Sequence, residues 1–170
     1  MSSTPAPAAP DPAQDPAPTP GRMDPERIAA LLPPAPQPAA NYVPVREFGG
    51  ALHVAGQTPH VEGVLRLRGR VGVEVTPADA RELARDAALN AVSALNAHLG
   101  GLAELGGIVS LTVFVACGPE FGQHPWVADG ASELLVELFG DDGRHARAAV
   151  GVSSLPDGAP VEVSVVAARR

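Results

Sequence analysis

Arg147 and Glu162 are two residues near the C-terminus whose types and spacing could do chemistry on a small anionic substrate. Arg147 stands at the start of an expected short apolar strand, and Glu162 lies among valines in the next one, beyond a turn at residues 155–158. A guanidinium matches both oxygens of a carboxylate, and a carboxylate side chain can orient water or exchange a proton. A structural ion pair at a sheet edge explains the same residues without any chemistry, and this segment alone favours that explanation.

The composition excludes several classes of function. The chain has 170 residues, enough for one domain with a real core, and its net charge of −7 offers no basic surface to nucleic acid. All 12 basic residues are arginine, which excludes a lysine Schiff base and with it ordinary pyridoxal-phosphate or lysine-aldolase catalysis. No apolar run approaches the roughly 20 residues that span a bilayer, so we expect no membrane partner.

The cysteine and histidine content predicts neither disulfides nor metals. Cys117 is the only cysteine, so it cannot form an internal disulfide, which fits a reducing compartment and predicts a cytoplasmic protein. The five histidines have no paired metal-ligand spacing, and we expect no metal site and no cofactor. His145 lies two positions before Arg147 and could border a site, although a solvated loop histidine is the better interpretation.

The chain divides near residue 40. Residues 1–40 are predicted to be a disordered leader rich in proline and alanine, in which residues 1–21 have too little apolar bulk to offset their ordering entropy. The leader contains one possible short helix, with Asp24 as N-cap and Pro25 at the first helical position, which Pro33-Pro34 would stop. This helix could either cover part of the core or extend away from the domain. Residues 41–170 are predicted to form the folded domain.

The folded domain has the element order of an α+β protein. The expected elements are strands at residues 42–46 and 51–55, a short strand or extended loop at 64–70, a helix at 76–99, a strand at 108–116, a helix at 126–139 and two C-terminal strands. Thr76 caps the first long helix and Gly100-Gly101 ends it. This order predicts a mixed sheet with two helices packed on one face.

The strands carry more apolar surface than two helices can hide. The residues counted toward this surface are Val43, Val45, Val54, Val113, Val115, Val150, Val152, Val163 and Val165. We therefore expect the open face of the sheet to be covered by self-association.

A series of short motifs resembles the RidA (YjgF) family of reactive-intermediate deaminases. In chain order they are Asn41-Tyr42-Val43-Pro44, residues 49–59 with Gly56-Gln57-Thr58-Pro59, Arg70-Val71-Gly72, residues 147–152, Leu155-Pro156 and Val161-Glu162-Val163. Each motif is a modest signal, but their order and spacing match the family over about residues 41–170. The segments at 130–140 and 144–147 resemble a bacterial branch rather than the best-known members.

The resemblance implies a chorismate-mutase-like fold, a homotrimer, and sites in clefts between subunits. Members that have the arginine hydrolyse 2-imino and 2-enamino acids, made by pyridoxal-phosphate enzymes, to 2-keto acids and ammonia. By position, Arg147 matches the arginine that grips the substrate carboxylate, and Glu162 matches the acidic residue that positions the hydrolytic water. Tyr42 matches a tyrosine that lines the cleft, and Gly56 matches the backbone beside the substrate.

Three departures from the family pattern leave a second function open. Ala55 stands where many members have serine, Ala149 where cysteine is frequent, and Asp129 near a frequent asparagine. Arg147, which would bind the substrate carboxylate, is retained despite these changes, but its presence does not define the range of substrates. The alternative is a non-catalytic trimeric module that binds a small carboxylate, such as a 2-keto acid, or a protein partner.

Overall fold

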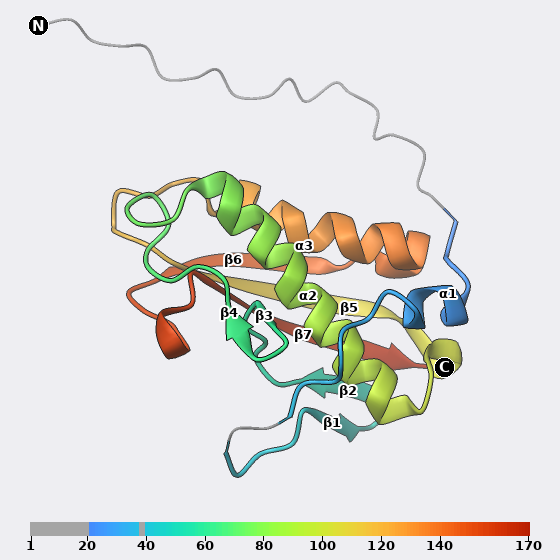
Figure 1. The fold of residues 1–170 in the computed structure, drawn as a ribbon. Coiled ribbons are helices and arrows are strands. Elements are labelled where there is room, and N and C mark those ends of the chain that lie inside the picture. Colours follow the sequence, from blue (N-terminus) through green and yellow to red (C-terminus); the bar gives the residue numbers. More distant parts are fainter. Residues whose placement is uncertain (1–20, 38–39) are drawn as a thin grey trace, which may run out of the picture.

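A computed structural model describes residues 21–37 and 40–170, which form a sheet covered on one face by helices (Figure 1). Across the sheet the strands are β1 (Val45–Phe48), β2 (Ala51–Val54), β7 (Val161–Arg169), β5 (Leu105–Ala116) and β6 (Ala146–Val152). The two long helices, α2 (Pro77–Leu99) and α3 (His124–Phe139), lie on the same face. Only the β5–β6 pair is parallel among the described strands of this sheet. The predicted α+β class, with a mixed sheet and two helices on one face, is confirmed.

The first two strands form the expected hairpin. β1 and β2 pair antiparallel, and the turn uses Gly49 and Gly50, which both have positive φ. Glycine adopts this conformation without a steric cost, so the tight turn can form. Residues 64–70 form little regular structure: β4 (Val64–Leu65) pairs only with β3 (His60–Val61), in a separate small ribbon.

Helix α2 begins and ends where its capping residues predict. The Thr76 hydroxyl accepts a hydrogen bond from the Asp79 backbone N–H at 3.1 Å, and Gly100 ends the helix in the left-handed conformation. Its buried face is rich in alanine, which lets the helix approach the sheet closely. Helix α3 begins at His124, two residues earlier than predicted, and Gly130 allows it to pack against the Arg81 carbonyl of α2.

The register of the sheet places Arg147 and Glu162 on opposite faces. In the parallel β5–β6 pair, Arg147 lies beside Leu111, which is fully buried under the helices. In the antiparallel β5–β7 pair, Glu162 lies beside Phe114, and its neighbour Val163 is buried on the helix side. Because side chains alternate along a strand, Glu162 belongs to the face away from the helices.

Part of the predicted leader packs on the domain. Asp24 caps the short helix α1 (Pro25–Ala29) by accepting from the Glu26 N–H at 2.8 Å, and Ile28 is completely buried in the core. Arg22 pairs with Asp142 at 2.7 Å, and the Ser93 hydroxyl donates to the Pro33 carbonyl at 2.7 Å. Residues 1–20 and 38–39 lie outside the described residues, so the boundary near residue 40 stays a prediction.

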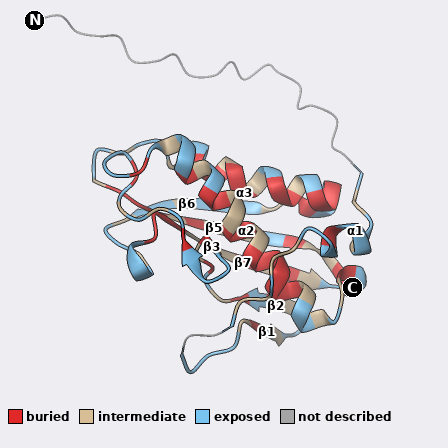
Figure 2. Cartoon of the chain, viewed as in Figure 1, coloured by how far each residue is buried: buried red, intermediate tan, exposed pale blue. Residues whose placement is uncertain are grey.

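The sheet face opposite the helices is not covered by any described element (Figures 1 and 2). The valines counted from the sequence are mostly not on this face: Val45, Val54, Val113, Val115, Val163 and Val165 are buried, because they point toward the helices. The apolar side chains that do lie there are fewer, and include Phe114, Val166 and Val150, the last 42% exposed. Self-association through this face stays a proposal.

Candidate functional site

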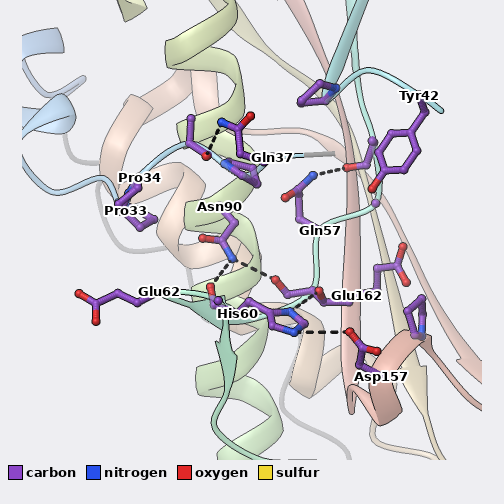
Figure 3. Close-up of a pocket in the computed structure, with 18 residues that line it drawn as sticks. Pro33, Pro34, Gln37, Tyr42, Gln57, His60, Glu62, Asn90, Asp157 and Glu162 are labelled. Atoms are coloured by element: carbon purple, nitrogen blue, oxygen red, sulfur yellow. Dashed lines mark hydrogen bonds and ion pairs between the residues drawn. The ribbon is translucent and has the colours of Figure 1, made fainter. Parts of the chain in front are cut away.

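A cavity of about 810 Å³ lies beside the first residues of β7, where the chain leaves β2 (Figure 3). One wall is formed by Glu162 of β7 together with the segment from Ala55 to Thr58. The opposite wall is formed by residues 33–37 and by Asn90 of α2, while Tyr42 and the turn at Pro156-Asp157 lie at other parts of the lining. The cavity therefore collects three of the four residues that the sequence predicted for the site: Tyr42, Gly56 and Glu162.

Glu162 has an environment suited to proton exchange. The side chain is half-buried in the cavity wall, and desolvation raises the pKa of its carboxyl group above the usual value of a glutamate. Gly56 makes this placement possible, because a Cβ at position 56 would collide with Glu162 Oε1. Gly56, the glycine predicted to lie beside the substrate, thus leaves space for the Glu162 carboxylate because it has no side chain.

Backbone and amide hydrogen bonds hold the segment around Gly56. Gln57 exchanges two backbone hydrogen bonds with Val163, at 2.8 and 2.9 Å, and its side-chain amide donates to the Ala55 carbonyl at 2.9 Å. The buried Asn90 amide donates to the carbonyls of Thr58 and His60, at 3.0 and 2.9 Å. These bonds tie the loop after β2 to both β7 and α2, so the cavity wall is fixed on two sides.

The charge of the cavity lining is negative. Three carboxylates line it, from Glu62, Asp157 and Glu162, and none of its described lining residues is an arginine. His60 also lines the cavity, and its Nε2 lies 3.7 Å from Asp157. One copy of the chain therefore offers no arginine to hold a substrate carboxylate in this cavity.

Arg147 lies on the other side of the sheet, against α3. Its Nη1 donates to Asp129 at 2.7 Å and to the Ser132 hydroxyl at 3.0 Å. Asp129 is also 3.7 Å from Arg81, whose Nη2 pairs with Glu133 at 2.5 Å. Asp129 and Ser132, which lie one turn apart on α3, hold Arg147 in place. Within one chain, Arg147 does not lie near Glu162.

Ser132 and His145 complete the surroundings of Arg147. His145 Nε2 lies 3.1 Å from the Ser132 hydroxyl, and His145 Nδ1 lies 2.6 Å from the Gly143 carbonyl. The sequence indicates His145 as a possible residue at the border of the site, but it does not single out Ser132. The spacing alone could not reveal it, because Ser132 is on α3 and meets Arg147 only through the packing of α3 on β6.

The described residues give two further results on cofactors and membranes. In residues 21–37 and 40–170, no group of three histidine, cysteine, aspartate or glutamate side chains is placed to hold a metal ion. Over the same residues, every helix is too short or too polar to cross a membrane.

Comparisons with known proteins identify a family for this chain. Residues 26–167 match the family described as "YjgF/chorismate_mutase-like, putative endoribonuclease". A curated relative, Protein TCP17 of Trypanosoma cruzi, is 42% identical over 142 residues, which are 83% of this chain and 89% of the relative.

Solved structures give the same result. The protein Atu1372 of Agrobacterium tumefaciens, described as of unknown function, has 39% identity and a TM-score of 0.79, with 85% of this chain and 91% of that chain covered. A Yersinia pestis protein described as a member of the Rid family has 26% identity and a TM-score of 0.56, over 79% and 92% of the two chains. The resemblance in the sequence is confirmed: this chain belongs to the YjgF/chorismate-mutase-like family, and within it to the RidA type.

Proposed function

We propose that this protein hydrolyses 2-imino and 2-enamino acids to 2-keto acids and ammonia, in a site that two neighbouring copies complete within a homotrimer. The observation that carries the proposal is the half-buried Glu162, with a raised pKa, in the wall of a cavity of about 810 Å³. Arg147 supplies the missing cation, but from the opposite face of the sheet. A second copy of the chain is therefore needed to place an arginine at this cavity.

Arg147 keeps enough free donors to hold a carboxylate. Its contacts with Asp129 and Ser132 both use Nη1. No described residue occupies its Nε or Nη2, so two parallel N–H groups can bind both oxygens of a substrate carboxylate. Asp129 and Ser132 fix the guanidinium in place, which lowers the entropy lost when the substrate binds.

Glu162 supplies the proton chemistry that imine hydrolysis requires. A protonated imine is already electrophilic, so water attack needs orientation and a proton acceptor rather than a strong nucleophile. Burial raises the pKa of the Glu162 carboxyl group, which moves this pKa toward neutral pH. The group can then take a proton from the attacking water and return it to the leaving nitrogen.

The assembly is supported by the open face of the sheet. Phe114, Val150 and Val166 lie on a face that no described element covers, and the edge strand β6 is largely exposed. A second copy that covered this face would bury apolar surface, which is the usual driving force of association. The family resemblance makes a trimer the specific expectation.

A non-catalytic module that binds a small carboxylate is the second candidate. Asp129 already pairs with Arg147 at 2.7 Å and offsets its charge, whereas the family resemblance implies that a neutral asparagine is frequent near this position. Ala55 also lacks the hydroxyl that many members place in the cavity wall. Binding without turnover would follow if these changes remove the orientation that water needs.

The endoribonuclease activity in the family's description is not supported by the charge of this chain. A polyanion requires clustered basic residues. The cavity instead has three carboxylates and no arginine in its described lining, and the whole chain has a net charge of −7.

We also infer that the protein acts in the reducing cytoplasm. Cys117 is a free, buried thiol, and the chain has no second cysteine. This supports a compartment in which disulfides do not form.

The direct test is a coupled assay in which a pyridoxal-phosphate dehydratase generates 2-aminoacrylate and the decay of the imine is followed. Arg147→Ala should lower kcat/KM by roughly tenfold to a hundredfold or more, because a charge-assisted hydrogen bond contributes about 1.5–3 kcal/mol. Arg147→Lys should not restore full activity, because an ammonium cannot bind two oxygens side by side. Arg46→Ala, at an exposed arginine of β1, is the control and should change nothing.

Two outcomes would decide against the proposal. Wild-type protein that binds 2-keto acids through Arg147, but accelerates no imine decay, would establish the binding module instead. If Arg147→Ala altered neither turnover nor binding, Arg147 would be a structural ion-pair residue and both candidates would fail.

A further inference from the structure

The segment at residues 33–37 forms the wall of the cavity that lies across from Glu162, and this wall is rich in proline (Figure 3). Pro33, Pro34 and Pro36 all line the cavity. Proline has no backbone N–H, and its ring presents carbon and hydrogen to a ligand. This wall therefore offers apolar surface, and few hydrogen-bond donors, to a molecule bound in front of Glu162.

The proline wall is attached to the domain. The Ser93 hydroxyl of α2 donates to the Pro33 carbonyl at 2.7 Å, and Ile28, a few residues earlier, is completely buried in the core. Each proline also has a fixed φ, which limits the conformations of the segment. The wall thus keeps its shape before a ligand binds, so that binding costs little ordering entropy.

The side-chain amides near this wall are already engaged by the protein. Asn90 donates to the carbonyls of Thr58 and His60, at 3.0 and 2.9 Å. The Gln57 amide donates to the Ala55 carbonyl at 2.9 Å. A polar substrate side chain would have to compete with these bonds, whereas an apolar one would leave them intact.

The cavity is large for a small imino acid. Its volume is about 810 Å³, within the range of roughly 300–1,000 Å³ that is usual for sites enclosing drug-sized ligands. The arginine side chain of a second copy would occupy part of this space. A three-carbon substrate such as 2-aminoacrylate would still leave water against the prolines, but a substrate with a larger side chain would displace it.

We propose that the cavity selects 2-imino acids with a bulky apolar side chain, such as those made from leucine or phenylalanine, and that residues 33–37 form the subsite for this side chain. This inference rests on the proposed imine hydrolysis and names its substrate class. A substrate whose reacting carbon lies at Glu162 faces the proline wall across the cavity, so its side chain can be buried there. Such burial increases kcat/KM about fourfold for each carbon that leaves water.

Two further carboxylates in the lining would instead favour a cationic side chain. Asp157 has a side chain that is 68% exposed, with His60 Nε2 at 3.7 Å, and Glu62 lies in the exposed turn between β3 and β4. Solvent and salt weaken the attraction of such exposed charges. The proline wall is therefore expected to decide the selectivity, and an arginine-derived imine tests the alternative.

The experiment compares imines in the full-length protein. An amino acid oxidase, with catalase present, generates the 2-imino acids of alanine, leucine and arginine, and the decay of each imine is followed. The leucine-derived imine has three more carbons than the alanine-derived one, which would give about a sixtyfold higher kcat/KM if all three were buried. We expect a preference of at least tenfold, mainly through a lower KM, over both other imines.

Ala35→Phe fills the subsite with a ring, and it should lower the leucine-to-alanine ratio of kcat/KM roughly tenfold, because about two buried carbons of the substrate lose their place. Ala29→Phe is the matched control, since Ala29 is exposed on α1 and is not among the described lining residues. It should keep the wild-type ratio. Melting temperatures near that of the wild type would show that both variants are folded.

Calorimetry tests the subsite without turnover. Wild-type protein should bind 4-methyl-2-oxopentanoate at least tenfold more tightly than pyruvate, and Ala35→Phe should reduce this difference. If this result held while no imine was hydrolysed, the proposed hydrolysis would fail and the apolar subsite would be supported as a binding site.

Three results would overturn the subsite while leaving imine hydrolysis in place. They are equal kcat/KM for the alanine- and leucine-derived imines, a preference for the arginine-derived imine, and a leucine-to-alanine ratio that Ala35→Phe does not change. The second of these would assign the selectivity to Glu62 and Asp157.

Discussion

At the scale of single residues, the candidate site depends on an unfavourable placement of charge. Glu162 is half-buried, and this desolvation raises the pKa of its carboxyl group because the charged form is poorly solvated. Such a group costs stability at neutral pH, where an ordinary glutamate is ionised. A residue kept against that cost is a typical feature of a functional site.

Glu162→Gln should therefore raise the melting temperature at pH 7. The raised folded-state pKa means that the folded protein binds the proton more tightly than the unfolded chain, so stability from this group is present at low pH and is lost as pH rises through the folded pKa. The gain in the variant should shrink as the pH is lowered and vanish below the ordinary pKa of glutamate. Thermal melts of both proteins across this pH range provide the measurement. An equal or lower melting temperature of the variant at pH 7 would contradict it.

Gly56→Ala should damage both stability and turnover. A methyl group at this position would collide with Glu162 Oε1, so the carboxylate or the loop must move. Gly122→Ala is the matched control, because nothing lies within 4 Å of a Cβ there. Melting temperature and kcat/KM should fall in the first variant only. A second change, Glu162→Ala, should recover the stability of Gly56→Ala but not its activity.

Asp129→Asn should strengthen the binding of 2-keto acids. The aspartate offsets the charge of Arg147 at 2.7 Å, and an asparagine keeps a hydrogen-bond acceptor without the charge. Exposed ion pairs contribute up to about 1 kcal/mol, so the expected decrease in Kd is at most about fivefold. Calorimetry with 2-oxobutyrate at low and high salt provides the test, and a weaker affinity in the variant would show that Asp129 serves to orient Arg147.

At the scale of elements, the helices were predictable and the strand partners were not. Thr76 and Gly100 are local signals, and they set the ends of α2 because capping needs only neighbours in sequence. The faces of Arg147 and Glu162 depend on the pairing of β5 with β6 and with β7, which joins segments far apart in sequence. The contact of Ser132 with Arg147 was missed for the same reason.

The N-terminal segment shows the limit of composition as a guide. Residues 21–37 are rich in proline and alanine, yet Ile28 is fully buried and Arg22 is bound to Asp142 and to the carbonyls of Leu102 and Leu105. A single well-placed isoleucine and arginine are enough to attach such a segment. Average hydrophobicity cannot reveal this, because it does not record which side chains find a partner.

Deletion of residues 1–20 should leave the melting temperature nearly unchanged, whereas Ile28→Ala should lower stability by about 2–5 kcal/mol, the usual cost of a large cavity in a core. Leu31→Ala, on the same segment but 52% exposed, is the control. Denaturant unfolding of the three proteins provides the measurement. If Ile28→Ala had no effect, the segment before residue 40 would not be part of the folded unit.

At the scale of the whole molecule, the residues predicted for the site lie on two separate surfaces of one chain. The cavity has the carboxylate and the glycine but no arginine, and the arginine lies with its own serine and histidine on the far side of the sheet. The family motifs predicted these four residues, and the resemblance implies a site between subunits, but the sequence does not show which residues lie on which surface. We propose that an assembly of several copies joins these two surfaces in one site.

The most direct test of this account mixes two strongly impaired variants. Arg147→Ala and Glu162→Gln are each expected to keep only a small part of the activity alone, but after unfolding together and refolding, or after co-expression, a mixed trimer contains sites with one intact half from each variant. Random assembly in equal amounts should restore about a quarter of the wild-type imine hydrolysis. A mixture as inactive as its components, although mixed oligomers are detected by native mass spectrometry, would contradict a site shared between copies.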